Sequence, residues 1–336
     1  FEDLRTFLSK GGEKGVQRPV LSQGQAFPIH PVGFLVLTVS KVYGVPADEN
    51  SRAAQTQGVK AYGLDPQDLT MVFIQQEEDG RDVVGVVTVL EGAPLPAGAI
   101  AGRLEGFDDI AKLEVVAEER ERSLATLPAS EKPNDTGTGN DEAEDGKRAL
   151  HGGAPNPRSR GNTELIEGIL SSKNALHNNY QDFQKFIEAG GCIGMQHDPL
   201  LYGAYALNPF LVRVDIVPML VVEQGQVAVI KAYVGLPTRD TSGDNFKFGA
   251  LVRPGHLGVW EEPLRTGKYP LNPHCYQHEI VPTSMIALNW SERTSTAHAL
   301  DKDLNTIRGK SMEGFIFSID LQVQIRRLPK PVVAMV

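Results

Sequence analysis

Residues 194–209 have the sequence G-M-Q-H-D-P-L-L-Y-G-A-Y-A-L-N-P, and residues 258–273 have the sequence G-V-W-E-E-P-L-R-T-G-K-Y-P-L-N-P. The two align without a gap, and their register continues to an Ile-Val-Pro triplet shared by residues 216–218 and 280–282. A looser copy, G-V-Q-R-P-V-L-S-Q-G-Q-A-F-P-I-H-P, occupies residues 15–31. We call these copies, in chain order, the first, second and third motifs. Such self-similarity indicates one supersecondary unit stacked on copies of itself.

The residues inside each motif predict short strands and a turn. In the third motif Gly267 suits a turn, and Tyr269 and Leu271 lie two apart, as side chains do on one face of a strand. Asn272-Pro273 ends the run, because proline has no N–H group to donate to a central ladder. Each motif is therefore predicted to be a β-hairpin, namely a strand, a tight turn and a returning strand. A longer strand that ends in Val-Pro is predicted to follow.

A short helix is predicted in front of the first two motifs. Residues 1–12 match residues 180–191 at an offset of 179. In the second of these stretches aromatic residues recur at helical spacing before a Gly-Gly pair, where helices commonly end. A further β segment is predicted at residues 83–90 and again at 226–231. One complete unit is thus a helix, a Gly-Gly turn, a hairpin and a long strand.

Other segments have equally plain patterns. Residues 128–162 are rich in Gly, Pro, Asn and acidic residues, with Leu150 their only large apolar residue, so they are predicted to be disordered. Residues 34–43 are too short an apolar run to span a bilayer and are predicted to be a buried strand. Residues 315–325 alternate between apolar and polar, which predicts a half-buried strand.

The predicted fold class is α+β and β-rich, with tandem helix–β-hairpin repeats. A chain of 336 residues suits two or three domains. The predicted segments, in chain order, are residues 1–106, a first unit with an inserted loop of some β character at 46–82; residues 107–162, a helix at 108–127 and a disordered acidic linker; residues 163–249, a second unit opened by a helix at 163–175 with Thr163 as its N-cap; and residues 250–336, the third hairpin with the strand beyond it.

Charge and cysteine content exclude some classes of protein. The net charge is −9 and no cluster of Lys and Arg occurs, so a nucleic-acid surface is not expected. Cys192 and Cys275 occupy non-equivalent places in their repeats, which is no disulfide framework and suits a reducing compartment. No signal peptide is visible. Because the sequence opens at Phe1 inside a repeat helix, we expect it to be the ordered part of a longer polypeptide.

One group of residues resembles a site for a soft metal. On a strand His274, Tyr276 and His278 would share a face, and two histidines beside the thiol of Cys275 are ligand types that zinc accepts. However, no acidic partner is implied, and the position that matches His278 in the second motif region is Val214. Solvated strand residues are the favoured interpretation, and metal binding stays open.

Further chemistry is not indicated. The chain has no P-loop, no G-x-S-x-G elbow and no H-E-x-x-H helix. Gln196-His197-Asp198 is a weaker candidate than the histidine pair, and no pairing of a nucleophile with a base is apparent. We therefore assign no catalytic, cofactor-binding or metal-binding residues and no cofactors, and we expect no enzyme.

The third motif and the residues beyond it carry a family resemblance. The matching text is G-H-L-G-V-W-E-E-P-L-R-T-G-K-Y-P-L-N-P at 255–273, I-V-P-T at 280–283, L-N-W at 288–290, L-D-K-D-L at 300–304 and the strand from Gly314-Phe315 to Asp320. Residues 255–327 thereby resemble the opening of an SPFH domain, also called band 7 (stomatin/prohibitin/flotillin). The upstream units resemble the N-terminal extension of large flotillin-like bacterial members. A fainter likeness is to vault shell proteins, in which β-rich repeats lead into an SPFH-like shoulder.

The resemblance implies a non-enzymatic membrane scaffold that forms large homo-oligomeric rings or cages. Its partner is then itself, and its location is at a membrane, namely the bacterial inner membrane. The family's membrane anchor and coiled coil are expected outside this segment. Neither subunit number, client, organism nor side of the membrane follows from the sequence. The alternatives are a vault-like shell protein and a monomeric repeat adaptor that binds a partner protein.

Overall fold

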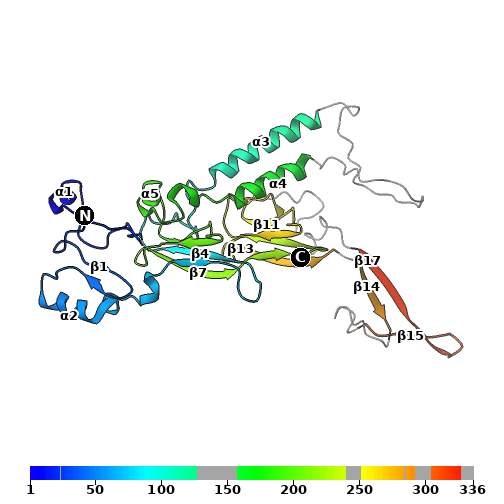
Figure 1. Ribbon diagram of the computed structural model, residues 1–336. Coiled ribbons are helices and arrows are strands. Elements are labelled where there is room, and N and C mark those ends of the chain that lie inside the picture. The colour runs from blue at the N-terminus through cyan, green and yellow to red at the C-terminus, as the bar shows by residue number, and fades with distance from the viewer. Residues whose placement is uncertain (23, 127–156, 240–250, 284, 292–303, 327–336) are drawn as a thin grey trace. The chain divides into compact units, whose positions relative to one another are not determined.

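The protein is α+β and β-rich, as predicted, with more strand than helix (Figure 1). The computed structural model describes residues 1–22, 24–126, 157–239, 251–283, 285–291 and 304–326. The chain forms two compact units, and each unit is built from several separate segments of the chain. The first comprises residues 1–220, 233–236 and 269–276, and the second comprises residues 221–232, 237–268 and 277–336.

The main sheet of the first unit has the strand order β5–β4–β7. Its central strand β4 (Val83–Val89) is antiparallel to β5 (Gly194–Met195) and β7 (Val212–Pro218). The sequence V-V-G-V-V-T-V is β-branched and apolar on both faces, so β4 is buried almost throughout. A separate ladder joins β3 (Val72–Ile74) to β6 (Gly203–Tyr205). Strands that are far apart in sequence therefore build the first unit.

The main sheet of the second unit has the order β10–β11–β9–β13. Its strands are β10 (Leu251–Val252), β11 (Gly258–Trp260), β9 (Gln226–Ala232) and β13 (Tyr276–Pro282). A small core of Val227, Val229 and Val281 packs there. The strand β8 (Leu220–Val222) pairs with β12 (Gly267–Tyr269).

The strands of the second and third motif regions have matching positions. Adding 64 to the first residues of β5, β6 and β7 gives the first residues of β11, β12 and β13. The pairing also matches, because β4 lies between β5 and β7 as β9 lies between β11 and β13. The ends in Pro218 and Pro282 agree with the predicted long strands.

The predicted hairpin is wrong. The two short strands of the second motif do not pair with each other; β5 pairs with β4, and β6 pairs with β3. In the third motif β11 pairs with β9 and β12 with β8. Strands of two or three residues form too few hydrogen bonds to be stable as a hairpin. The second and third motifs instead add their strands to a strand pair supplied by the preceding stretch of chain.

The helices in front of the first two motifs agree with prediction. These are α1 (Leu4–Ser9) and α5 (Phe183–Glu188), and the carboxylates of Asp3 and Asp182 cap their first turns. A β-carbon at Gly191 would collide with the ring of Phe186, and the same holds at Gly12 for the ring of Phe7. The second glycine of each pair is thus required by an aromatic ring that packs on it. The helix, its capping aspartate, the packed phenylalanine and the glycine beneath it all recur at the offset of 179.

The two longer helices, α3 (Asp108–Ala125) and α4 (Pro157–Leu170), pack side by side. Helix α3 matches the predicted helix at 108–127. The predicted N-cap is wrong, because Thr163 lies inside α4, where its hydroxyl donates to the carbonyl of Ser159. Most of the predicted acidic linker lies outside the described residues, and its end at 157–162 is helical rather than disordered.

The stretch predicted as an inserted loop, 46–82, is only partly a loop. It contains α2 (Glu49–Gln57), two 3₁₀ turns and β3, which confirms its predicted β character. A small core forms where Val59 and Leu64 pack with Val42. The apolar run at 34–43 is also not one buried strand. It forms β1 (Val36–Leu37) and β2 (Val42–Tyr43), a two-stranded ladder of mixed burial.

The last described residues form two-stranded ribbons. Strand β14 (Met285–Trp290) pairs with β17 (Leu321–Arg326), and β15 (Ile307–Lys310) pairs with β16 (Ile316–Ile319). The predicted half-buried strand at 315–325 is therefore divided at Asp320, where its partner changes, and β16 is exposed throughout. A ribbon of two strands has no second layer to cover an apolar face. No helix in the described part of the chain is both long and apolar enough to cross a membrane.

Candidate functional site

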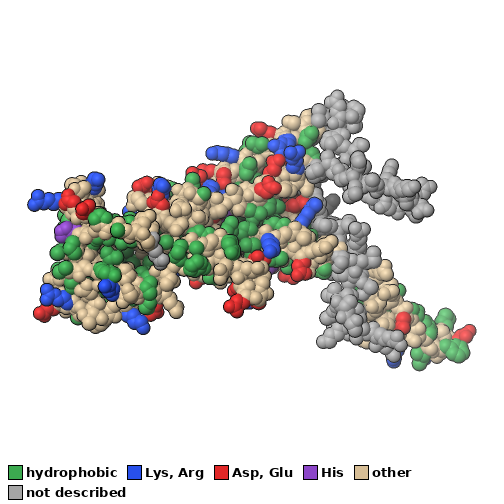
Figure 2. Space-filling model, viewed as in Figure 1, with side chains coloured by type: hydrophobic (Ala, Val, Ile, Leu, Met, Phe, Trp, Pro, Cys, Tyr) green, Lys and Arg blue, Asp and Glu red, His purple; other side chains and the backbone are tan. Residues whose placement is uncertain are grey.

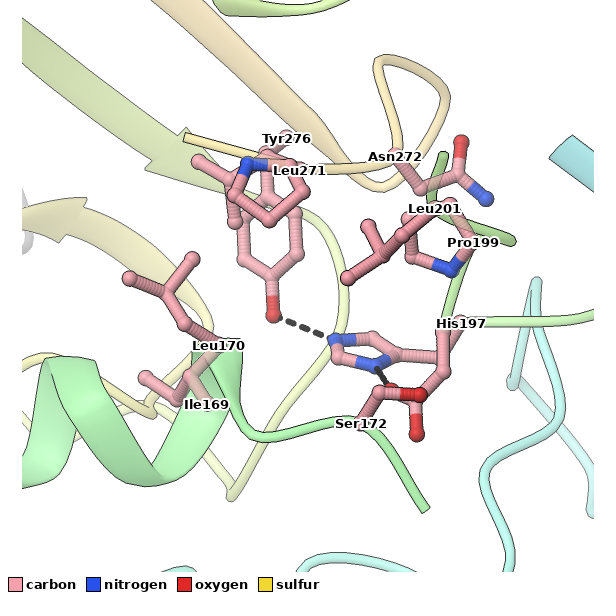
Figure 3. Close-up of a pocket in the computed structure, with 11 residues that line it drawn as sticks. Ile169, Leu170, Ser172, His197, Pro199, Leu201, Leu271, Asn272 and Tyr276 are labelled. Carbon is pink, nitrogen blue, oxygen red and sulfur yellow. Dashed lines mark hydrogen bonds and ion pairs between the residues drawn. The ribbon is translucent and has the colours of Figure 1, made fainter. Parts of the chain in front are cut away.

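A small pocket in the first unit is bordered by a buried histidine, an aspartate and a tyrosine (Figure 3). His197 and Asp198 follow β5, and Tyr276 follows a turn in which Asn272 accepts hydrogen bonds from the backbone N–H groups of Cys275 and Tyr276. The three side chains come from motif regions about eighty residues apart in the chain. The other lining residues are mostly apolar: Ile169, Leu170, Ser172, Pro199, Leu201, Pro270, Leu271 and Asn272.

His197 connects the two other polar side chains. Its Nδ1 lies 2.6 Å from Oδ1 of Asp198, and its Nε2 lies 2.7 Å from the hydroxyl of Tyr276. The ring of Phe107 meets the imidazole edge to face at a centroid distance of 5.3 Å. All hydrogen-bonding atoms of the imidazole thus have partners in a buried setting, which fixes its orientation.

Asp198 joins this group to a buried arginine. Its Oδ2 accepts a 2.7 Å hydrogen bond from the backbone N–H of Lys173, and its Oδ1 lies 3.8 Å from Nε of Arg103. The guanidinium of Arg103 also forms a two-pronged ion pair with Asp109 at 2.7 and 3.0 Å and lies over the ring of Phe107. The side chain of Arg103 is only 1 % exposed, and these two carboxylates compensate its buried positive charge.

Burial and charge set the protonation of the site. Burial opposes ionisation of Asp198, but its hydrogen bond to His197 and the nearby Arg103 outweigh burial, so the pKa of Asp198 is lowered. Burial raises the pKa of Tyr276 well above its usual value. Burial likewise raises the pKa of the Cys275 thiol to about 12. At neutral pH the carboxylate is therefore ionised, and the phenol and thiol keep their protons.

This arrangement has the connectivity of an acid–histidine–hydroxyl relay but lacks a usable nucleophile. Tyr276 is 3 % exposed and its phenol stays protonated, whereas a nucleophile must be reached by substrate and activated. His197 at 3 % exposure is equally shielded. The physical effect of the group is to hold the start of β13 against the start of the second motif, just after β5. We interpret the site as a structural junction.

A second contact, made in both motif regions, supports the junction interpretation. Nδ2 of Asn272 donates to the carbonyl of Gln196 at 2.9 Å, and Nδ2 of Asn208 donates to the carbonyl of Gln17 at 2.9 Å. The asparagines are 64 residues apart and the glutamines are 179 apart, which are the offsets of the motifs themselves. Each asparagine therefore attaches its own motif to the third residue of the motif before it.

The structure does not assemble the proposed metal ligands. His274 and His278 are exposed, whereas Cys275 is fully buried and protonated. Among the residues that the structure describes, no three His, Cys, Asp or Glu side chains are grouped closely enough to hold a metal ion. The expectation that this strand segment is solvated is wrong for Cys275 and Tyr276, because their side chains face the core. The burial of His197 was not predicted from the sequence. The available signal was Asn272, the repeated asparagine, which fixes the turn in front of Tyr276.

Comparison with known proteins adds no further assignment. No protein-family model, no curated protein and no solved structure matches the chain.

Proposed function

We propose that the protein is a non-enzymatic structural scaffold, built from tandem β-rich repeats, that assembles into large homo-oligomers. The observation that carries this proposal is the recurrence of backbone hydrogen bonds whose partners are shifted by constant offsets, 64 residues on one side of the bond and 143 on the other. Gly85 and Leu200 exchange N–H···O bonds of 2.9 and 2.8 Å, and Ala228 and Leu264 exchange bonds of the same lengths. The backbone N–H of Met219 donates to the carbonyl of Asp82, and the N–H of Thr283 donates in the same way to the carbonyl of Gly225.

Such recurrence is typical of repeat proteins, in which each unit contacts mainly its neighbours. The buried contact of His197 with Tyr276, which the sequence resemblance does not explain, likewise holds one motif region against the next within the first unit. Repeat proteins in general offer an extended surface rather than a single cleft, which suits a scaffold better than an enzyme.

Two long strands offer edges for lateral assembly. Among the described sheets, β7 and β13 are both edge strands, and Ile216 in β7 is half exposed. A strand at the edge of a sheet favours pairing with another chain, and a closed ring of identical copies covers every such edge. The resemblance of residues 255–327 to the opening of an SPFH domain adds the proposal of membrane association, through segments outside these residues, at the bacterial inner membrane. A vault-like shell is the related alternative.

Sedimentation velocity of the chain at micromolar concentration tests the proposal. We expect particles of many copies for the wild type. Val115→Lys, at an exposed position on α3, should leave the particle size unchanged, whereas Ile216→Lys, in the edge strand β7, should give smaller particles. The two positions are 56 % and 50 % exposed, so neither substitution should affect folding. A stable wild-type monomer would contradict the scaffold and favour a monomeric adaptor.

A further inference from the structure

The edge strand β7 directs a defined set of backbone groups away from its sheet. The carbonyl of Leu211 and the N–H of Met219, which flank β7, both bond to residues that flank β4. Residues of an antiparallel pair alternate between bonding to the partner strand and facing away from it. The backbone groups of Val214 and Ile216 therefore point away from β4, at the end of the three-stranded sheet (Figure 1).

The corresponding strand of the second unit has the same open edge. Strand β13 matches β7 at the offset of 64 and is likewise an end strand among the described sheets. The carbonyl of Cys275 and the N–H of Thr283, which flank β13, bond to residues that flank β9. The backbone groups of His278 and Ile280 therefore point outward, as those of Val214 and Ile216 do. A complete repeat precedes β13 in the chain, so the open edge is a property of the repeat itself.

Strand β7 also carries two opposite charges that lie two residues apart on one face. Arg213 and Asp215 are both exposed, and neither forms an ion pair with another residue in the described part of the chain. The matching residues of β13 are Gln277 and Glu279, which lack the positive charge. On the face of the first unit drawn in Figure 2, basic and acidic side chains are interspersed without a broad field of one sign. Individual charge pairs therefore determine how two copies align.

We propose that β7 pairs antiparallel with β7 of a second copy, around a twofold axis at Val214. The inference rests on the proposed function for the association of identical copies, and it names the partner of one lateral edge. In this register Arg213 of each copy lies opposite Asp215 of the other. The N–H of each Val214 donates to the carbonyl of the other Val214, and the N–H of Ile216 donates to the carbonyl of Val212 in the second copy.

Charge excludes the neighbouring registers. An axis at Asp215 would place this carboxylate opposite its own copy, and an axis at Arg213 would do the same with the guanidinium groups. Like charges directly opposite each other destabilise an antiparallel pair. The length of the paired segment is limited as well, because the N–H of Val212 already donates to the carbonyl of Asn208 and Pro218 has no N–H. The middle of β7 is therefore the part that pairs, in one register.

Disulfide trapping of the full chain tests this register. The variants are made in a Cys192→Ser background, in which the remaining Cys275 is fully buried. Under mild oxidation, a mixture of Arg213→Cys and Asp215→Cys chains should give at least about tenfold more covalent dimer than either variant alone, because two equivalent cysteines would lie diagonally and too far apart. The other Arg213–Asp215 pair stays intact in the mixed dimer. Val115→Cys, at a position that is 56 % exposed, is the control for random collision.

Exchange of the two charges gives an independent readout. Arg213→Asp and Asp215→Arg should each raise the midpoint concentration of assembly at least about fivefold in sedimentation velocity, because like charges then face each other. The double variant, which restores unlike charges, should assemble as the wild type does. Failure of this rescue would overturn the inference.

The two readouts separate the inference from the proposed function. Equal trapping by the mixture and by the single variants, or no trapped dimer, would overturn the pairing of β7 whatever the particle size. Particles of many copies without the trapped dimer would leave the scaffold standing. A trapped dimer that associates no further would support the pairing and contradict the large homo-oligomer.

Discussion

The first and second motif regions have the same local structure but different burial. Helices α1 and α5 have the same length, the same capping aspartate and the same ring-on-glycine contact, yet Phe186 in α5 is fully buried whereas its counterpart Phe7 in α1 is only partly buried. The difference lies in β3 and β4, which cover the second region. Helix ends and turns are thus determined by nearby residues, whereas strands and core form only where the preceding stretch of chain supplies a partner.

The largest expected effect contrasts the two equivalent phenylalanines. Phe186→Ala removes a fully buried ring and should lower the free energy of unfolding by about 3–5 kcal/mol. Phe7→Ala should lower it by only about 1 kcal/mol, because that ring is only partly buried. Urea denaturation followed by circular dichroism measures both. Equal losses would show that the first region is as well covered as the second.

A pH effect is expected from the second region. Burial lowers the pKa of His177 from 6.5 to about 4, and His177 is 1 % exposed. The unfolded chain therefore binds more protons than the folded chain between these two pH values, so stability is complete above pH 6.5 and is lost as the pH falls toward 4. The loss should reach about 3 kcal/mol, from about 1.4 kcal/mol for each pKa unit.

The matched variant for this prediction is His177→Asn. Its amide oxygen can replace Nδ1 of His177, which accepts a 2.7 Å hydrogen bond from the N–H of Tyr180, but it does not titrate. Urea denaturation from pH 4.5 to 7 should show a flatter stability profile for this variant. Identical profiles would exclude His177 as the cause.

Loss of the asparagine contact should lower the free energy of unfolding by similar amounts in both motif regions. Asn272→Ala removes the donor to Gln196 and leaves that carbonyl without its side-chain partner, at a cost of about 1–3 kcal/mol. Asn208→Ala should have a comparable cost through the carbonyl of Gln17. A negligible effect of Asn208→Ala in thermal denaturation would mean that the first motif is not attached to the second.

The smallest expected effect concerns the helix caps. Asp182→Ala should lower the free energy of unfolding by about 1 kcal/mol, because the carboxylate caps a helix whose side chains belong to the core. Asp3→Ala should change the global free energy of unfolding by less than about 0.5 kcal/mol, since α1 has no buried residue and can unfold locally. A larger effect of Asp3→Ala than of Asp182→Ala would reverse the comparison.

Several elements of the fold could be predicted from local sequence. The β-branched run of β4, the aromatic spacing of α5 and its Gly-Gly end depend on neighbouring residues, and the structure confirms them. The partners of β5 and β6 could not be predicted, because they lie more than a hundred residues upstream, and local pairing was the simpler hypothesis. Burial of β16 was predicted from alternation alone, and alternation does not reveal whether a second layer exists.

The candidate site was harder to predict for the same reason. His197 and Asp198 are adjacent in sequence and gave a weak signal, and the hydroxyl of Tyr276 that completes their network comes from the next motif region. The burial of a polar residue depends on packing between segments that are far apart in the chain, which the composition of either segment does not reveal. The repeat itself predicted that the units stack, and the asparagine repeated at positions 208 and 272 could have shown where consecutive motifs meet.

The most direct test of the central claim is native-state hydrogen exchange of the isolated chain, resolved to single amides. The claim is that each motif folds on a strand pair supplied by the stretch before it. The amides of Gln196 and Leu200, which donate to β4, should exchange only on global unfolding, whereas their counterparts Gln17 and Leu21 should exchange close to the rate of an unfolded peptide. Equal, strong protection of Gln17 and Leu21 would contradict the account.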